Sequence, residues 1–341
     1  MKKHIIISPR EGSDFSMDLI FAGLVRRFGK ENVIDWPPRA KHREGKPELI
    51  GHDEQDYGAE RRSLCYVEGC GDMKEWSRSE IITEIFSHNV DAVFLDETNE
   101  SAVYWHELFA LYSGVVRTVV IAGHDSFRGL PRGVLASFGP NTTMFVDDWK
   151  SEYDELENTY LTNLSCNFDH LWDVENRDKY LADKKYDICF IGYNSNPARK
   201  VVIDHVKKKW GHLNNCIVFE ERPDMYDAFV RHDEMFRLIA QSKICLNLPG
   251  ASTNGRALRY YEIPYVGSLM VSMRTLATDL AMAPAMGFCF ESLEELDKLI
   301  QQRLDDNGYC EDVACLDHYG CMESHTIDAR MNYIFEVLNN G

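Results

Sequence analysis

The sequence predicts an α/β fold made of two Rossmann-like αβα domains that face each other across a cleft. The chain has 341 residues, which is more than one hydrophobic core usually supports, so we expect two domains. Short apolar runs alternate with amphipathic stretches in the first half, and the same alternation restarts after a polar segment that ends near residue 185. Such β-then-α alternation is typical of parallel, doubly wound sheets.

The first half has the pattern of alternating strands and helices. Strands are expected at residues 4–8, 32–36, 92–96 and 118–122, and helices at 16–28, 80–86 and 102–112. The charged, proline- and glycine-containing stretch 37–62 is expected to be a long surface loop. Its basic residues, Arg39 to Lys46 among them, form a local positive patch that could cover an anionic acceptor, or a solvated loop.

In the second half the expected strands are 186–191, 216–219, 244–248, 269–272 and 288–290. The expected helices are 198–210, 233–241, 255–261 and 293–304, followed by a final amphipathic helix at 326–338. We therefore expect an N-terminal domain at residues 1–170, a linker at 171–185 and a second domain at 186–322. Residues 323–341 are expected to cross back to the first domain.

Charge and cysteine usage narrow the functional classes. The 37 basic and 55 acidic residues give a net charge of −18, which disfavours broad binding to nucleic acid or to anionic membranes. No apolar run approaches the roughly 18 residues that a membrane span needs. The ten cysteines are scattered, and several lie inside apolar runs, where cysteine behaves as a small hydrophobe. We expect a cytoplasmic protein.

One junction in the second half has the features of a phosphate-binding loop. The apolar run 244–248 stops at a Pro-Gly pair, small polar residues follow, and two arginines and a glutamate come next. A strand–loop–helix junction offers an anion free backbone N–H groups and the positive end of a helix. Arg256, Arg259 and Glu262 are spaced by three, so a helix would present them on one face. The pattern suits a nucleotide diphosphate, and also an ordinary helix start with solvated charges.

Taken in order, these residues resemble the nucleotide-binding half of GT-B glycosyltransferases, in particular the bacterial and phage proteins similar to the spore-maturation CgeB glycosyltransferases. The resemblance rests on residues 242–248, on the loop that follows, and on 259–264 and 267–272. It also rests on a strand that ends in glycine with an arginine after it, a Phe-x-Ser-x-Glu-Glu-Leu segment, and a terminal His…Arg helix: Gly192, Arg199, Phe290, His325 and Arg330. The matches cover residues 186–335, and the first half resembles the family only loosely.

The resemblance implies a donor, a UDP or GDP sugar, in the second domain and an acceptor in the first. Glu262 would accept from two ribose hydroxyls. Arg199, with either Arg256 or Arg259, would neutralise the departing diphosphate. The remaining donor-binding positions are Gly192, Ser195, Gly250, Ser252, Thr253 and Asn254. The charged residues Glu220, Glu221 and Arg222 follow a strand where such folds contact the base, or simply face water.

The general base is expected after the strand at 118–122. His124 and Asp125 follow that strand, and ligands in open α/β sheets gather at the carboxyl ends of strands. His124 could take a proton with Asp125 orienting it, Asp125 could be the base, or the pair could form an ordinary capped turn. A second candidate is the loop after the first strand, with Glu11 or Asp14.

No metal site is expected. Two acidic pairs, Asp147-Asp148 and Asp305-Asp306, lack Asp-x-Asp spacing and are interpreted as solvated loops. A second cluster has spacings that could hold zinc, although it contains no Cys-x-x-Cys pair and lies in a helix-like segment: Cys310, Cys315, His318, Cys321 and His325.

The function expected from the sequence is transfer of a hexosyl or pentosyl group to a hydroxyl acceptor without a metal ion. The acceptor is open: a small molecule, a glycan or a hydroxylated base in phage DNA. Tyr104, Trp105 and His106 offer stacking surfaces for a sugar or a base, or pack in the core. The alternative is a sugar-nucleotide-binding module without catalysis. A dinucleotide oxidoreductase is disfavoured because no Gly-x-Gly-x-x-Gly follows the first strand of either domain.

Overall fold

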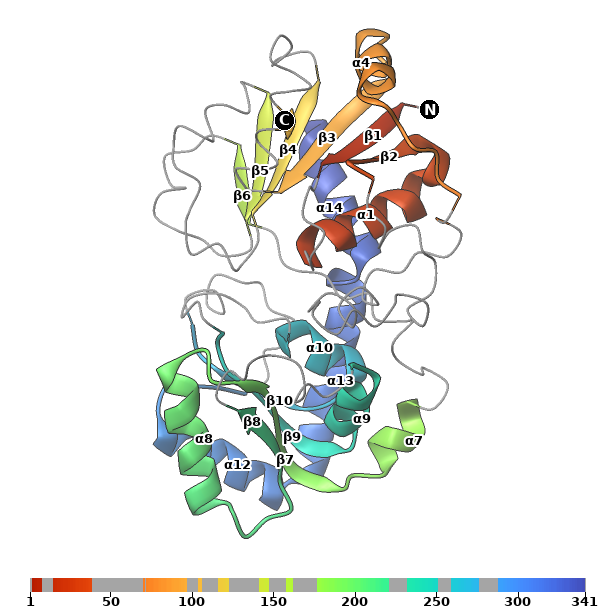
Figure 1. Cartoon of the computed structure of the whole chain (residues 1–341). Coiled ribbons are helices and arrows are strands. Elements are labelled where there is room, and N and C mark those ends of the chain that lie inside the picture. The colour runs from red at the N-terminus through yellow and green to blue at the C-terminus, as the bar shows by residue number, and fades with distance from the viewer. Residues whose placement is uncertain are drawn as a thin grey trace. The chain divides into compact units, whose positions relative to one another are not determined.

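The computed structural model of the chain describes residues 2–7, 15–38, 70, 72–96, 104–105, 116–122, 141–146, 158–161, 177–220, 232–250, 259–275 and 288–340. The chain forms two compact units (Figure 1). Unit 1 consists of Met1–Asn163 together with Ile327–Gly341, and unit 2 consists of Leu164–Thr326. Each unit holds one sheet whose paired strands are parallel. The predicted class, two Rossmann-like α/β units with a C-terminal helix that returns to the first, is confirmed.

The sheet of unit 1 has the strand order β2-β1-β3-β4-β5-β6. Its strands are β1 (Lys3–Ile7), β2 (Val33–Trp36), β3 (Val90–Asp96), β4 (Arg117–Ala122), β5 (Thr142–Val146) and β6 (Thr159–Leu161). Its helices are α1 (Phe15–Phe28), the 3-10 turn η1 (Lys30–Asn32), α4 (Arg78–Phe86) and α14 (Ile327–Asn340). The short strands β5 and β6 lie outside the elements that the sequence predicted.

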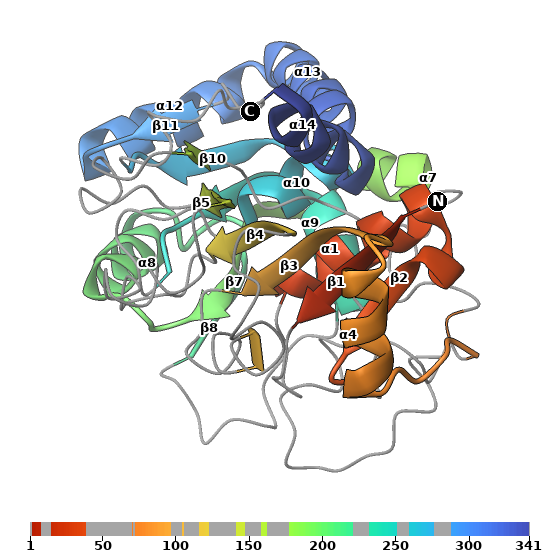
Figure 2. The ribbon, with the colours of Figure 1, turned by 90° about the horizontal axis from the view of Figure 1, so that it is seen from above.

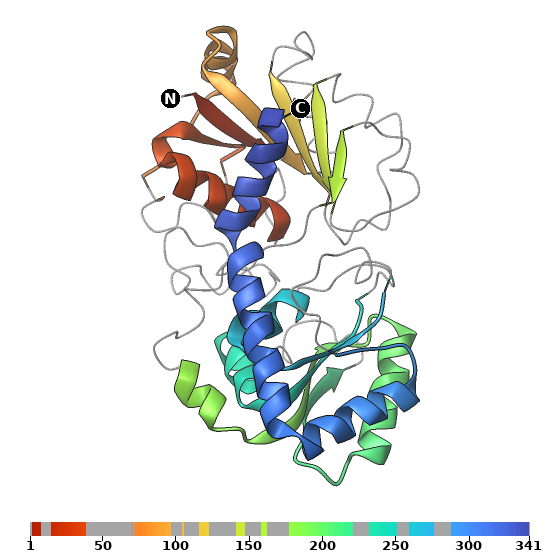
Figure 3. The same cartoon turned by 180° about the vertical axis from the view of Figure 1, so that it is seen from behind.

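Successive side chains of β1 point to opposite faces of the sheet of unit 1, and both faces are covered. Ile5 and Ile7 pack in one core cluster with Ile81 and Ile85 of α4. On the other face the ring of His4 lies among aromatic rings of α1, β3 and α14: Phe28 at 4.0 Å, Phe94 at 6.4 Å and Phe335 at 5.5 Å between centroids. Seen from above, the strands lie between α4 and α14 (Figure 2), and α14 runs beside α1 (Figure 3).

The sheet of unit 2 has the order β11-β10-β9-β7-β8. Its strands are β7 (Tyr186–Tyr193), β8 (Cys216–Glu220), β9 (Ser242–Asn247), β10 (Met270–Met273) and β11 (Phe288–Phe290). Its helices are α7 (Arg177–Ala182), α8 (Pro197–Lys209), α9 (His232–Ala240), α10 (Arg259–Val266), α12 (Leu293–Asp305) and α13 (Asn307–Ser324). Helix α7 lies within the stretch that the sequence indicated as a linker, and it packs on α9.

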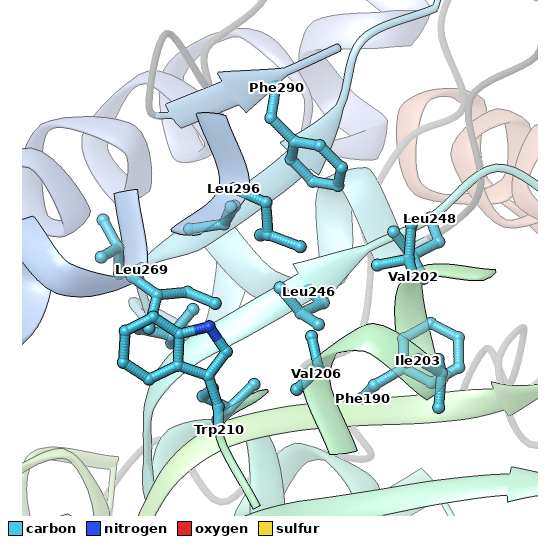
Figure 4. Close-up of a cluster of buried hydrophobic side chains, with 14 of the residues drawn as sticks. Phe190, Val202, Ile203, Val206, Trp210, Leu246, Leu248, Leu269, Phe290 and Leu296 are labelled. Carbon is cyan, nitrogen blue, oxygen red and sulfur yellow. The ribbon is translucent and has the colours of Figure 1, made fainter. Parts of the chain in front are cut away.

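Helices cover both faces of the second sheet as well. Phe190 and Leu246 pack against Val206 of α8 and Leu296 of α12, and Trp210 belongs to the same cluster (Figure 4). The opposite face meets α9, where the thiol of Cys245 donates to the Ile239 carbonyl. Cys189 pairs in register with Cys216 and Cys245 on the neighbouring strands. Cys189 and Cys245 are buried and free, so these two cysteines do pack as small hydrophobes.

The structure corrects the predicted end of one helix. The described part of the helix expected at residues 255–261 runs from Arg259 to Val266, through Pro264, and so continues beyond the predicted end at Tyr261. Proline removes one backbone hydrogen bond within a helix, yet every residue from Tyr260 to Val266 is buried, and this packing holds the helix. In the parts of the chain that the structure describes, no helix is long and apolar enough to cross a membrane.

Candidate functional site

The site is built where the strand order of unit 2 reverses. From β7 the chain moves to β8 on one side and then to β9 on the other, so β7 and β9 flank the topological switch point. In open α/β sheets, ligands bind outside the carboxyl ends of the strands at such a point. Tyr193 ends β7 and residues 194–199 follow it, while residues 248–250 follow β9, so both segments lie at this edge.

Asn196 ties the two segments together. It is the N-cap of α8, with Pro197 in the first turn, and its Oδ1 accepts from the Ala198 N–H at 2.9 Å. This is the usual role of an asparagine before a helix, and proline suits the first turn because its missing N–H would have no partner there. The Nδ2 group of Asn196 donates to the Gly250 carbonyl at 3.1 Å. One buried side chain therefore starts the helix and holds the turn after β9.

Arg199 is the centre of this arrangement. The residue is buried, and its guanidinium donates to three backbone carbonyls: Nε to Pro249 at 2.7 Å, Nη1 to Tyr193 at 2.9 Å and Nη2 to Leu248 at 3.0 Å. No carboxylate of the described residues forms a salt bridge with it. The pKa of Arg199 is lowered to about 10, mainly by burial and also by the nearby charge of Arg259, while Tyr193 opposes the shift.

Gly192 makes room for this guanidinium. A Cβ at Gly192 would lie 3.0 Å from the Phe190 ring and 3.5 Å from Arg199 Nη1. A Cβ at Gly250 would meet Arg199 Nη2 only at 3.7 Å, which is ordinary contact. Of the two glycines predicted for the site, Gly192 is therefore the one with a tight packing requirement.

The first turn of α10 carries an ion pair. Arg259 Nη1 binds Glu262 Oε2, three residues later on the same helix, and Arg259 Nη2 donates to the Ile191 carbonyl of β7 at 3.3 Å. The Glu262 side chain is 2% exposed and that of Arg259 is 22% exposed. A carboxylate this deeply buried depends on its partner, since an unpaired buried charge is strongly destabilising.

Two further polar side chains near the switch point keep an unused hydrogen-bonding atom among the described residues. Asn247, the last residue of β9, donates through Nδ2 to Ser272 Oγ at 3.1 Å, while its Oδ1 is buried without a partner. The Oγ of Ser195 is also buried without a partner. Ser195 was predicted from the sequence and Asn247 was not, because an asparagine at the end of an apolar run has no distinctive spacing.

Helix α13 packs against α10. His318 Nδ1 donates to the Pro264 carbonyl at 3.0 Å, and Cys321 Sγ donates to the Tyr261 carbonyl at 3.7 Å. The ring of His325 lies 5.5 Å from that of Tyr261. These residues belong to the cluster weighed for zinc, and in the described part of the chain no group of three or more His, Cys, Asp or Glu side chains could hold a metal ion.

The remaining predicted site residues lie outside the described residues: His124, Asp125, Ser252, Thr253, Asn254 and Arg256. The alternative base candidates Glu11 and Asp14, the pair Asp147-Asp148, and most of the basic stretch at 37–62 lie outside them too. Trp105 is buried and Tyr104 packs beside Trp36, with 5.1 Å between ring centroids. The structure thus places Gly192, Ser195, Arg199, Gly250, Arg259 and Glu262 in unit 2, around the ends of β7 and β9 and the start of α10.

Comparison with known proteins agrees with this fold. Residues 193–336 match the family described as glycosyl transferase-like. The chain is similar to Anabaena Alr3699/HepE in complex with UDP, with 12% identity, a TM-score of 0.58 and 100% of both chains covered. It is similar to sucrose-phosphate synthase from Thermosynechococcus elongatus, with 10% identity, a TM-score of 0.60 and 100% of both chains covered.

A third similar structure is the DNA modifying enzyme β-glucosyltransferase, with 10% identity, a TM-score of 0.55 and coverage of 99% of this chain and 100% of that one. At such identities the likeness concerns the fold. No curated protein matches the sequence. The family match and the shared GT-B fold confirm the resemblance that the motifs of the second half predicted.

Proposed function

We propose that this protein is an enzyme that moves a sugar from a nucleotide-diphosphate sugar to a hydroxyl acceptor without a metal ion. The match to the glycosyl transferase-like family and the GT-B fold support this. The observation that carries the proposal is a surplus of positive charge at the switch point of unit 2. Arg199 and Arg259 are close enough for their charges to interact, and among the described residues Glu262 pairs with Arg259, while no carboxylate pairs with Arg199.

This local charge is opposite to that of the whole chain, which is −18. Two guanidiniums and one carboxylate favour the binding of an anion, and guanidinium forks suit phosphate oxygens. Among the described residues, three of the five N–H groups of Arg199 donate to carbonyls, and the other two would bind phosphate oxygens. Holding the diphosphate as negative charge develops on it would lower the barrier to breaking the glycosidic bond.

The donor is proposed to be a UDP or GDP sugar, with Glu262 on the ribose and the loop of Gly250, Ser252, Thr253 and Asn254 along the phosphates. The Anabaena protein of the same fold is described in complex with UDP-glucose. Arg256 would add a second phosphate contact beside Arg259. The general base is proposed to be Asp125 or His124, which would remove the proton from the acceptor hydroxyl as that oxygen attacks the sugar.

The acceptor is proposed to be a hydroxylated base in phage DNA. A DNA modifying β-glucosyltransferase has a similar fold, and so has a sucrose-phosphate synthase, so a small molecule and a glycan are the alternatives that the test has to separate from DNA. The test is transfer to duplex DNA containing 5-hydroxymethylcytosine or 5-hydroxymethyluracil. Radiolabelled sugar should enter the DNA, and unmodified DNA of the same sequence is the matched control.

The reaction type is tested with a panel of UDP-, GDP- and TDP-sugars in buffer containing EDTA. We expect slow release of one free nucleoside diphosphate without any acceptor, and faster release with the correct one. Asp125→Asn should lower turnover while leaving donor binding unchanged. Tight donor binding with no release over hours, at every acceptor tried, would instead identify a binding module.

A further inference from the structure

The ion pair at the start of α10 has a consequence for how a donor enters the site. Arg259 and Glu262 are the two residues proposed to hold opposite parts of the donor, the diphosphate and the ribose. In the structure they hold each other instead. The pair uses one N–H of Arg259 Nη1 and one acceptor site of Glu262 Oε2, so it competes with a donor for both groups.

Burial limits how the pair can separate. With 2% of its side chain exposed, Glu262 has almost no access to water, so it needs new hydrogen-bond donors at the moment when Arg259 leaves. The two ribose hydroxyls of a nucleotide are such donors. Inorganic pyrophosphate has no such pair of neighbouring hydroxyls, so it must compete with Glu262 for Arg259 without that compensation.

Arg259 has a second anchor that lets its guanidinium turn without losing its place. Nη2 donates to the Ile191 carbonyl at the end of β7. Arg199 stays fixed by its three carbonyl bonds, and its positive charge lies near that of Arg259. An anion between the two guanidiniums therefore relieves their mutual repulsion and attracts Arg259 away from Glu262.

We propose that donor binding exchanges the partners of this pair: the ribose hydroxyls take over Glu262, and Arg259 is released to the diphosphate. The inference rests on the proposed function, since it requires a nucleotide at this site. It makes the two halves of the donor interdependent. A nucleoside diphosphate that carries ribose hydroxyls is bound tightly, whereas free pyrophosphate or phosphate, which is abundant in cells, is rejected.

The test compares three probes by calorimetry: UDP (or GDP, if that is the nucleotide bound), inorganic pyrophosphate, and the 2′,3′-dideoxynucleoside diphosphate. For the unmodified protein we expect the dideoxy probe to bind about a hundredfold more weakly than the ribonucleotide, because two hydrogen bonds to a charged group are lost and Arg259 stays paired. Equal affinity of the two nucleotides would overturn the exchange, and this measurement needs no variant.

Glu262→Gln gives the sharper outcome because its two effects have opposite signs. Loss of the negative charge should release Arg259, so pyrophosphate should bind about tenfold more tightly than it does to the unmodified protein. The preference for ribonucleotide over pyrophosphate should fall by tenfold or more. If the variant weakens both probes, or leaves pyrophosphate unchanged, the exchange is wrong.

A matched control is available on α9. Glu234 and Arg237 form the same Glu–Arg contact with the same spacing of three residues, 3.4 Å apart and exposed. Glu234→Gln should change pyrophosphate affinity by less than about twofold. Failure of the proposed function looks different from failure of the exchange: the unmodified protein would then bind neither nucleotide, whatever the behaviour of the variants.

Discussion

Gly23 of α1 lies directly against Met331 of α14, so closely that a Cβ at Gly23 would come within 2.5 Å of Met331 Cγ and 3.1 Å of Ile327 Cγ1. This contact is part of what joins the C-terminal helix to unit 1, because α1 and α14 pack side by side. The absence of a side chain at position 23 therefore sets how close the two helices can come.

Gly23→Ala should destabilise unit 1 by about 1–2 kcal/mol, as overpacking does in other cores. The sign is informative, because glycine to alanine inside a helix otherwise stabilises by about 0.5–1 kcal/mol. Urea unfolding gives the measurement. Gly308→Ala on α13 is the control, since among the described residues the nearest atom that a Cβ there would meet is Asp306 Oδ1 at 4.0 Å. An unfolding free energy unchanged or raised by Gly23→Ala would show that α14 adjusts without cost.

His4 should make unit 1 sensitive to acid. Burial lowers the pKa of His4 from 6.5 to about 4, with the charge of Asp91 opposing the shift and that of Arg27 adding to it. The folded state therefore binds fewer protons than the unfolded state between these values, and stability falls as the pH drops from about 6.5 to about 4. The loss should approach about 3 kcal/mol, and His4→Phe should abolish it. Urea unfolding of His4→Phe and of the unmodified protein at pH 7, 5.5 and 4.5 measures how much His4 contributes to the pH dependence of stability.

Asp317 should act in the opposite direction. This residue of α13 is 3% exposed, its Oδ2 has no partner among the described residues, and burial raises its pKa to about 7. The folded state holds the proton that the unfolded state has released, so stability falls as the pH rises from about 4 through 7. From pH 5 to pH 8, Asp317→Asn should gain about 2.5 kcal/mol relative to the unmodified protein. A constant difference between the two proteins across that range would mean that Asp317 finds a partner on ionisation.

Arg199→Lys should lower stability as well as donor affinity. An ammonium group cannot reach the carbonyls of Tyr193, Leu248 and Pro249 together, since they are held by a planar fork. We expect a loss of about 3 kcal/mol in unfolding free energy. Lys200→Ala is the neighbouring control, because the Lys200–Asp204 pair is exposed and contributes little. A variant that kept its melting temperature but lost donor affinity would limit Arg199 to ligand contact.

Local residue patterns were sufficient for most of the fold. β7 and β9 are apolar runs of the kind buried on both faces, and α8 begins at an Asn-Pro pair that caps and starts a helix. The spacing of three between Arg259 and Glu262 correctly put them in one helix. β5 and β6 escaped prediction because they are short and threonine-rich, and α7 because it is polar.

The partners of the charged residues could not be read from the chain, because they depend on segments far apart in the sequence. Arg199 bonds carbonyls some 50 residues away only because β9 pairs beside β7, and Arg259 reaches Ile191 across 68 residues for the same reason. Residue types and spacing thus predicted two Rossmann-like units, while the donor site stays a prediction. Strand pairing and helix packing decided that Arg199 holds a turn, that Arg259 reaches Ile191, and that α14 packs on Gly23, since such contacts form only when distant segments are brought together.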